Sequence, residues 1–130
     1  MSTSADLSEK TVLVIDDDQS NIFALRAYLE RDGVDVLTEE RAEDGLERLR
    51  ENDKAIDLVL IDIKMPEMDG YEATRAIRER LGREALPVVA VTGKASDEER
   101  QRCLDAGATD YLSKPIDLER LIAIMRENLS

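Results

Sequence analysis

Residues 58–70 read LVLIDIKMPEMDG, and this stretch contains the most informative boundary in the chain. Its apolar run, Leu58 to Ile61, is typical of a strand that helices cover on both faces. The run ends at Asp62, where an unpaired buried carboxylate would cost several kcal/mol unless a cation compensated its charge. We therefore predict that Asp62 takes part in metal or phosphate chemistry rather than in simple packing.

Two further apolar runs, at 12–15 and 88–91, have the same character, and we expect all three to be central strands of one sheet. The runs at 34–37 and 110–113 are interrupted by polar residues, which is typical of strands at a sheet edge. A helical pattern follows each predicted strand. This alternation predicts an α/β domain with a five-stranded parallel sheet and five helices.

Four of the predicted helices have a clear apolar stripe, and the fourth does not. The stripes consist of Ile22, Leu25 and Leu29; Ala42, Leu46 and Leu49; Ala73, Ile77 and Leu81; and Leu118, Leu121, Ile122, Met125 and Leu129. The fourth helix, at about 96–106, offers only Ala95, Cys103, Leu104 and Ala106 as inward candidates amid charged residues. We expect its packing to be light, and a lightly packed helix can move.

The chain has 130 residues, which fits one folded domain. We expect this domain at 10–130, after a polar N-terminal extension at 1–9. The extension lacks the basic and apolar regions of a secretory signal, and no apolar run reaches the ~18 residues that a membrane helix needs. We therefore expect a cytoplasmic protein that does not bind a membrane.

Charge and residue types exclude several functions. The net charge of -12 disfavours binding to nucleic acid, whose phosphates would repel the chain. The chain has no histidine, so it has no Ser-His-Asp triad, no histidine-ligated zinc site and no phosphohistidine. Its one cysteine cannot form an internal disulfide. Chemistry must therefore come from carboxylates, lysines and hydroxyls.

Polar residues follow the predicted strands at one edge of the sheet. They are the aspartates at 16–18, Asp62, Thr92 and Lys114. Parallel strands bring such residues together at their carboxyl ends, where ligands of doubly wound sheets bind. Taken singly, Asp17 or Asp18 could cap the next helix, Thr92 could complete a turn and Lys114 could be solvated. Only the whole set favours a site.

The predicted site has an excess of negative charge. Asp16, Asp17 and Asp62 would place about three negative charges together, and Lys114 offsets only one of them. A hard divalent cation with oxygen ligands is the natural partner, and Mg²⁺ fits because it needs only one or two carboxylates. Mn²⁺ is a possible substitute.

Four stretches together resemble the receiver domains of response regulators, over about 10–128. They are VLVIDDD at 12–18, LVLIDIKMPEMDG at 58–70, VVAVTGKA at 88–95 and DYLSKPID at 110–117. The resemblance implies a flavodoxin-like, doubly wound sheet with strand order 2-1-3-4-5. It is strongest to receivers of hybrid histidine kinases and to stand-alone single-domain regulators.

The resemblance also implies a phosphoryl acceptor and a metal site. Asp62 would accept a phosphoryl group from a histidine kinase or a histidine phosphotransfer protein. Asp17 would bind Mg²⁺ directly, Asp16 mainly through water, and the backbone carbonyl of Lys64 would complete the protein ligands. The domain would not be an enzyme, although it would catalyse its own phosphotransfer and slow autodephosphorylation.

A switch is implied by the same resemblance. Thr92 would hydrogen-bond a phosphoryl oxygen, Lys114 would form an ion pair with it, and Tyr111 would swing inward as Thr92 moves. The surface of the fourth helix, fifth strand and fifth helix would then bind a downstream protein. Tyr111 as a simple edge-strand aromatic is the alternative. We expect a monomer or a weak phosphorylation-dependent dimer.

Two lysines stand where the family varies, two residues past Asp62 and two past Thr92. Lys64 and Lys94 would reach the phosphoryl group and lengthen its lifetime, unless both side chains are merely solvated.

Three other functions remain as alternatives. A magnesium-dependent aspartyl-phosphate phosphatase shares the chemistry, but the position of its second acid is taken by Lys64. A flavin binder would need aromatic clamps, which a chain with one Phe, three Tyr and no Trp scarcely has. An unphosphorylated receiver that only binds proteins is the third.

Overall fold

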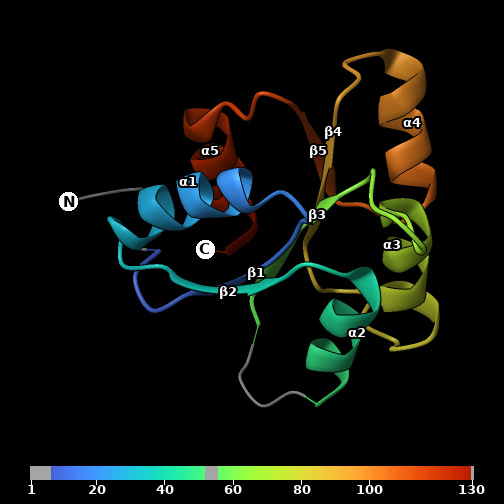
Figure 1. Cartoon of the computed structure of the whole chain (residues 1–130), viewed down its shortest axis with the longest axis horizontal. Helices are drawn as coiled ribbons and strands as arrows, with labels where there is room; N and C mark the ends of the chain where they lie inside the picture. The colour runs from blue at the N-terminus through green and yellow to red at the C-terminus, as the bar shows by residue number, and fades with distance from the viewer. Residues whose placement is uncertain (1–6, 52–55, 130) are drawn as a thin grey trace.

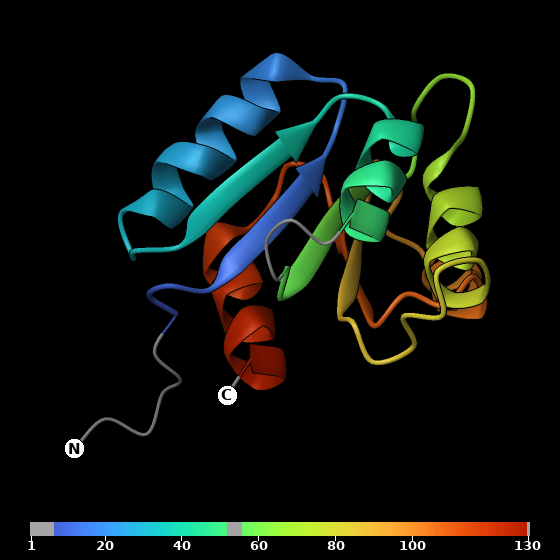
Figure 2. The ribbon, with the colours of Figure 1, turned by 90° about the horizontal axis from the view of Figure 1, so that it is seen from below.

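The computed structural model describes residues 7–51 and 56–129, which form a five-stranded parallel sheet with helices on both faces (Figures 1 and 2). The elements are β1 (Thr11–Ile15), α1 (Gln19–Glu30), β2 (Asp35–Glu39), α2 (Ala42–Glu51), β3 (Leu58–Asp62), α3 (Gly70–Glu79), β4 (Val88–Thr92), α4 (Asp97–Asp105), β5 (Asp110–Ser113) and α5 (Leu118–Leu129). The strand order β2-β1-β3-β4-β5 confirms the predicted topology, with β2 and β5 at the edges.

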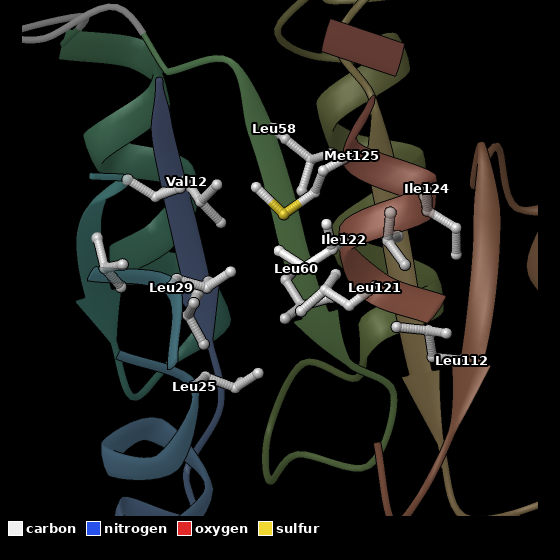
Figure 3. Packing of buried hydrophobic residues seen from close by; sticks show 14 of the residues in the cluster. Val12, Leu25, Leu29, Leu58, Leu60, Leu112, Leu121, Ile122, Ile124 and Met125 are labelled. Atoms are coloured by element: carbon white, nitrogen blue, oxygen red, sulfur yellow. The ribbon is translucent and has the colours of Figure 1, made fainter. Parts of the chain in front are cut away.

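Helices α1 and α5 cover one face of the sheet (Figure 1). Both contribute large aliphatic side chains, which meet those of β1, β3 and β4 in one hydrophobic cluster. Figure 3 shows Leu25 and Leu29 of α1 beside β1, and Leu121 and Met125 of α5 beside Leu58 and Leu60. The apolar stripes predicted for these two helices therefore form the core of this face.

Helices α2, α3 and α4 cover the opposite face (Figure 2). The stripes of α2 and α3 pack on β1 and β3 around Leu13, Ile15 and Ile61. Helix α4 contributes to a separate, smaller cluster with Tyr71 and Ala90. The outer strands β2 and β5 are only partly buried, as their interrupted apolar patterns predicted.

The light packing predicted for α4 is confirmed, but two of its inward candidates are wrong. Cys103 and Ala106 are buried, whereas Ala95 is exposed and Leu104 is only partly buried. Ala95 precedes Ser96, which caps the helix, so it lies in the loop before α4. Leu104 follows the inward-facing Cys103, and a step of one residue turns the side chain by about 100° around the helix, which leaves Leu104 at the edge of the buried face.

The packed part of the chain begins ahead of Lys10. Leu7 is buried in the core beside α1, and the N–H of Glu9 donates to the carbonyl of Gly33 at 3.0 Å. The predicted polar extension at 1–9 therefore includes residues that pack on the domain, and 1–6 lie outside the described residues. Among the helices of the described part, none is long and apolar enough to cross a membrane.

Candidate functional site

The predicted functional residues lie at the carboxyl ends of the strands, as the parallel topology requires. Asp16 directly follows β1, Asp62 and Thr92 end β3 and β4, and Lys114 directly follows β5. The register places Asp62 beside Val91 and Thr92 beside Ser113, so adjacent strands stop at the same level. Residues far apart in the sequence are thus gathered at one edge of the sheet.

Asp62 is buried and forms an ion pair with Lys114. Its side chain is only 4% exposed, and its Oδ2 accepts a hydrogen bond from Lys114 Nζ at 3.2 Å. The other oxygen accepts from the backbone N–H of Lys64 at 3.2 Å. Burial and the nearby charge of Asp16 raise the pKa of Asp62 above its usual value, although Lys114 and the Lys64 N–H oppose the rise. Asp62 is thus a desolvated carboxylate with one paired oxygen and an acidic neighbour.

Lys114 is the counter-charge of this site. Partial burial alone would lower its pKa, but the hydrogen bond and charge of Asp62, with the charges of Asp16 and Asp18, outweigh burial and raise the pKa. The ammonium group is therefore kept protonated beside Asp62. The peptide bond from Lys114 to Pro115 is cis.

The three aspartates after β1 have different environments. Asp16 is buried, and its oxygens accept from the N–H of Asp18 at 2.9 Å and from the side-chain amide of Asn21. Asp17 is exposed. Asp18 caps α1 by accepting from the backbone N–H groups of Ser20 and Asn21. The cap expected within 16–18 is thus Asp18, which leaves Asp16 and Asp17 for other roles.

One oxygen from each of Asp16, Asp17 and Asp62 lies within 4.8 Å of the others, an arrangement that could hold a metal ion. Three carboxylates of this kind, with one side open at the exposed Asp17, match the preference of Mg²⁺ for oxygen ligands and retained water. Lys64, whose carbonyl was predicted to be a further ligand, lies in the loop directly after Asp62. The donor set therefore fits a hard divalent cation.

The start of α3 packs directly against the backbone at the end of β3. The N–H of Gly70 donates to the carbonyl of Ile63 at 2.9 Å. A Cβ at Gly70 would lie 2.6 Å from the carbonyl oxygen of Asp62, too close for any side chain. Asp69, which precedes the glycine, caps α3. The Asp-Gly pair of the 58–70 stretch thus lets a helix begin beside Asp62.

Thr92 lies at the end of β4, the strand that pairs with β3. It is buried, and its Oγ1 accepts from the backbone N–H of Lys94 at 3.2 Å. Its hydroxyl therefore completes a turn, which was the alternative considered from the sequence. This bond leaves the hydroxyl hydrogen available to an acceptor at the site.

Tyr111 lies away from the carboxylates. It pairs with Ala90 across β4 and β5, is partly buried, and packs against the small cluster beneath α4. The structure thus brings together the aspartates, Lys114 and the end of β4, but not Tyr111.

Lys64 and Lys94 are exposed, and neither ammonium group has a hydrogen bond or ion pair within 7–51 and 56–129. Both line a cavity of about 520 Å³ that Thr92 also borders. The two lysines therefore share a cavity with Thr92, and their side chains are free to reorient.

Two residues of this region were missed in the sequence. Asn21 holds Asp16, and its position one turn into a helix capped by Asp18 could have indicated this contact. Glu99 is a buried carboxylate of α4 that lines the cavity beside Lys94. It lies in a run of charged residues, so nothing in the local pattern distinguished it.

Comparisons with known proteins show the family of this chain. Residues 12–126 match the family described as response regulator receiver domain. Protein PilH of Pseudomonas aeruginosa is 37% identical over 85% of this chain and 90% of its own length. Sensor histidine kinase CheAY of Helicobacter pylori is 34% identical over 94% of this chain, which spans only 15% of that protein.

A solved structure shares the fold throughout. The crystal structure of a putative response regulator from Chloroflexus aurantiacus has a TM-score of 0.85 and 27% identity, over 92% of this chain and 97% of that one. The matching sheet order, the acidic cluster at its edge and the family match lead to one conclusion. The chain belongs to the response regulator receiver domains, the receiving modules of two-component and phosphorelay systems.

Proposed function

We propose that Asp62 accepts a phosphoryl group from a phosphohistidine and thereby changes how this domain binds its partners. The observation that carries the proposal is the environment of Asp62. It is a buried carboxylate bonded to Lys114, within reach of two further carboxylates suited to a divalent cation. Packing alone gives no reason to bury such a charge.

In the proposed reaction an oxygen of Asp62 attacks the phosphorus in line. The new bond joins the Asp62 oxygen to phosphorus, and the bond from phosphorus to the donor's imidazole nitrogen breaks. Lys114 is placed to neutralise charge on the transferring oxygens, because it already contacts Asp62. Asp16, Asp17, Asp62 and the Lys64 carbonyl would hold Mg²⁺, which supplies charge neutralisation at the phosphoryl oxygens when bound.

The proposed switch begins at Thr92. An acyl phosphate carries about one more negative charge than the carboxylate that it replaces, and its oxygens can accept the free hydroxyl hydrogen of Thr92. Rotation of the Thr92 side chain about χ1 towards these oxygens would carry Oγ1 away from the Lys94 N–H and so move the loop before α4. Tyr111 packs under α4 and would follow that movement.

Partners follow from the same reaction. Receiver domains interact with histidine kinases or histidine phosphotransfer proteins, and we assign one of these as the donor for this chain. The surface of α4, β5 and α5 would bind the downstream protein, in the cytoplasm and as a monomer or weak phosphorylation-dependent dimer. Lys64 and Lys94 would lengthen the lifetime of the phosphorylated state by shielding the phosphoryl group from water.

The test is phosphoryl uptake by the parent and by an Asp62→Asn variant. With Mg²⁺ and a small acyl phosphate or a phosphorylated kinase, the parent should gain one hydroxylamine-labile phosphoryl group, detected by intact mass. The Asn variant should gain none, since its amide is not a nucleophile. Asp18→Asn is the matched control, because asparagine also caps helices and Asp18 should not be needed for transfer. Uptake by Asp62→Asn would place the acceptor elsewhere.

The lifetime of the phosphoryl group gives a second, finer measurement. Lys64→Asn and Lys94→Ala should each lose the group faster than the parent, by roughly twofold to fivefold, as expected for exposed charge interactions. Unchanged dephosphorylation rates would mean that both lysines are simply solvated.

A further inference from the structure

A cavity adjoins the phosphoryl acceptor on the α4 side of the sheet. It has a volume of about 520 Å³, and it is bordered by Thr92 and Lys94 after β4, by Lys64 after β3, and by Glu99 and Arg102 of α4. Lys94, Glu99 and Arg102 also line a smaller neighbouring hollow. The cavity therefore lies between the loop that follows β4 and the lightly packed helix α4.

Glu99 is the unusual residue in this cavity. The other charged residues of α4 are exposed, whereas Glu99 is only 9% exposed. Its carboxylate has one weak contact, from Cys103 Sγ to Oε1 at 4.0 Å. A carboxylate can accept several hydrogen bonds, so most of the acceptor capacity of Glu99 remains open towards the cavity.

Three cations border the cavity, and they differ in their access to Glu99. Lys64 follows β3 and does not line the smaller hollow that Lys94, Glu99 and Arg102 share. The guanidinium of Arg102 lies 4.3 Å from the centre of the Tyr71 ring, a cation–π contact that orients it over the aromatic face. Lys94 has no such contact for its ammonium group. Lys94 is therefore the donor that is free to approach Glu99.

Lys94 is also tied to the switch through its backbone. Its N–H donates to Thr92 Oγ1 at 3.2 Å, so a rotation of the Thr92 side chain that displaces Oγ1 changes the position of Lys94. One residue thus carries a backbone bond to the switch and a side chain in the cavity with Glu99. It connects the acceptor side of the cavity with α4.

We propose that Glu99 is a positioning residue that draws the Lys94 ammonium towards α4 and away from the phosphoryl group on Asp62. The inference rests on the proposed function of Asp62, and it adds a residue that sets the lifetime of the phosphorylated state. Glu99 and the phosphoryl group compete for the same lysine. In the proposed unphosphorylated state the Lys94 ammonium pairs with Glu99 near the N-terminal end of α4. When the phosphoryl group draws Lys94 away, this pairing is lost and the helix is loosened.

The experiment measures dephosphorylation rates of Glu99→Gln, Lys94→Ala and the double variant. Glu99→Gln keeps the shape but removes the charge, so Lys94 stays at the phosphoryl group and its lifetime should increase roughly threefold. In a Lys94→Ala background the same substitution should have no effect. Glu98→Gln, which removes an exposed charge from the same turn, should match the parent, and Glu99→Asp should restore most of the parental rate.

Hydrogen exchange in the unphosphorylated protein provides a second measurement. Amides at the start of α4 should exchange faster in Glu99→Gln and in Lys94→Ala, with no further increase in the double variant. Additive effects on exchange, or an equal change of lifetime with and without Lys94, would overturn the inference. If the parent took up no phosphate, the proposed function would fail, while the exchange data would still decide whether Glu99 and Lys94 interact.

Discussion

Helices α5 and α4 lie on opposite faces of the same sheet, and they are held in very different ways. Helix α5 buries Leu121, Ile122, Ile124 and Met125 in the largest core cluster, where they meet side chains of the sheet and of α1. Helix α4 buries only Cys103 and Glu99 along its length. The comparison teaches that α5 supplies stability, while α4 is held weakly enough to respond to charge at the site.

Helix α4 is also held unevenly from end to end. Beyond its C-terminal end, Arg78 of α3 donates to the carbonyls of Gly107, Arg83 and Leu86 at 2.9, 2.7 and 2.6 Å. At its N-terminal end the Ser96 side chain caps the helix, and farther along Arg102 stacks on Tyr71. We therefore expect the N-terminal end of α4 to move most.

The largest expected effect is on the α5 side. Leu121→Ala should lower the free energy of unfolding by about 3 kcal/mol, because it leaves a cavity in a tightly packed cluster. Urea unfolding monitored by circular dichroism measures this loss. Exposed Ala123, changed to Ser, is the control and should cost well under 1 kcal/mol. A small loss of stability for Leu121→Ala would remove the distinction between firmly packed α5 and lightly packed α4.

The next effect tests the anchor below α4. Arg78→Met keeps the length of the side chain but removes three hydrogen bonds to carbonyls, and it should cost about 2 kcal/mol in urea unfolding. Exchange should rise most for amides around Gly107. Arg75→Met, on the exposed side of α3, is the matched control. Increased exchange confined to the start of α4 would contradict the anchored end.

A smaller, stabilising effect is expected at Asp62, the last residue of the central strand β3. Without divalent cations at pH 7, Asp62→Asn should raise the free energy of unfolding by about 1 kcal/mol, because a desolvated charge is removed while Lys114 loses its partner. The pKa of Asp62 is raised by folding, so its contribution to stability is full below the unfolded value of about 4 and is lost as pH rises.

The advantage of Asp62→Asn should therefore shrink as pH falls towards 4. Thermal unfolding in EDTA, compared at several pH values, measures it. Adding Mg²⁺ should stabilise the parent more than this variant, since the variant lacks one of the three carboxylates. An advantage that grew at low pH would mean that Asp62 is stabilised as the charged form.

The smallest effect on stability is expected at Cys103 of α4. Cys103→Ala should cost less than about 1 kcal/mol, since one sulfur is lost from a small cluster. Burial, with the charge of Glu99, raises the pKa of this thiol to about 11, so native Cys103 should react slowly with iodoacetamide. Alkylation should nevertheless exceed the rate allowed by global unfolding, because local opening of α4 exposes the thiol. A rate equal to that of global unfolding would show that α4 is not looser than α5.

Much of the fold was predictable, because the spacing of apolar residues along the sequence indicates directly whether a segment forms a strand or a helix. The runs at 12–15, 58–61 and 88–91 are fully buried central strands, as their lack of polar residues indicated. The helix stripes face the sheet for the same reason. The errors fall on α4, where Ala95 and Leu104 were assigned to a buried face that charged residues made difficult to locate.

The site was predictable as a set of residues but not as a network. Strand ends marked Asp16, Asp62, Thr92 and Lys114, because parallel topology brings those positions together. Which aspartate caps α1, which side chain holds Asp16, and the burial of Glu99 depend on contacts between elements. No pattern within a single segment contains that information.

The sequence by itself determined the sheet, its order and the aspartate at the end of its third strand, since these follow from periodicity, chain connectivity and a resemblance over nearly the whole chain. Only the tertiary structure decided how firmly each helix packs on the sheet. That depends on side chains from α3, α4 and the loops meeting across the sheet, and burial of Glu99 or anchoring by Arg78 exists only once those elements pack together.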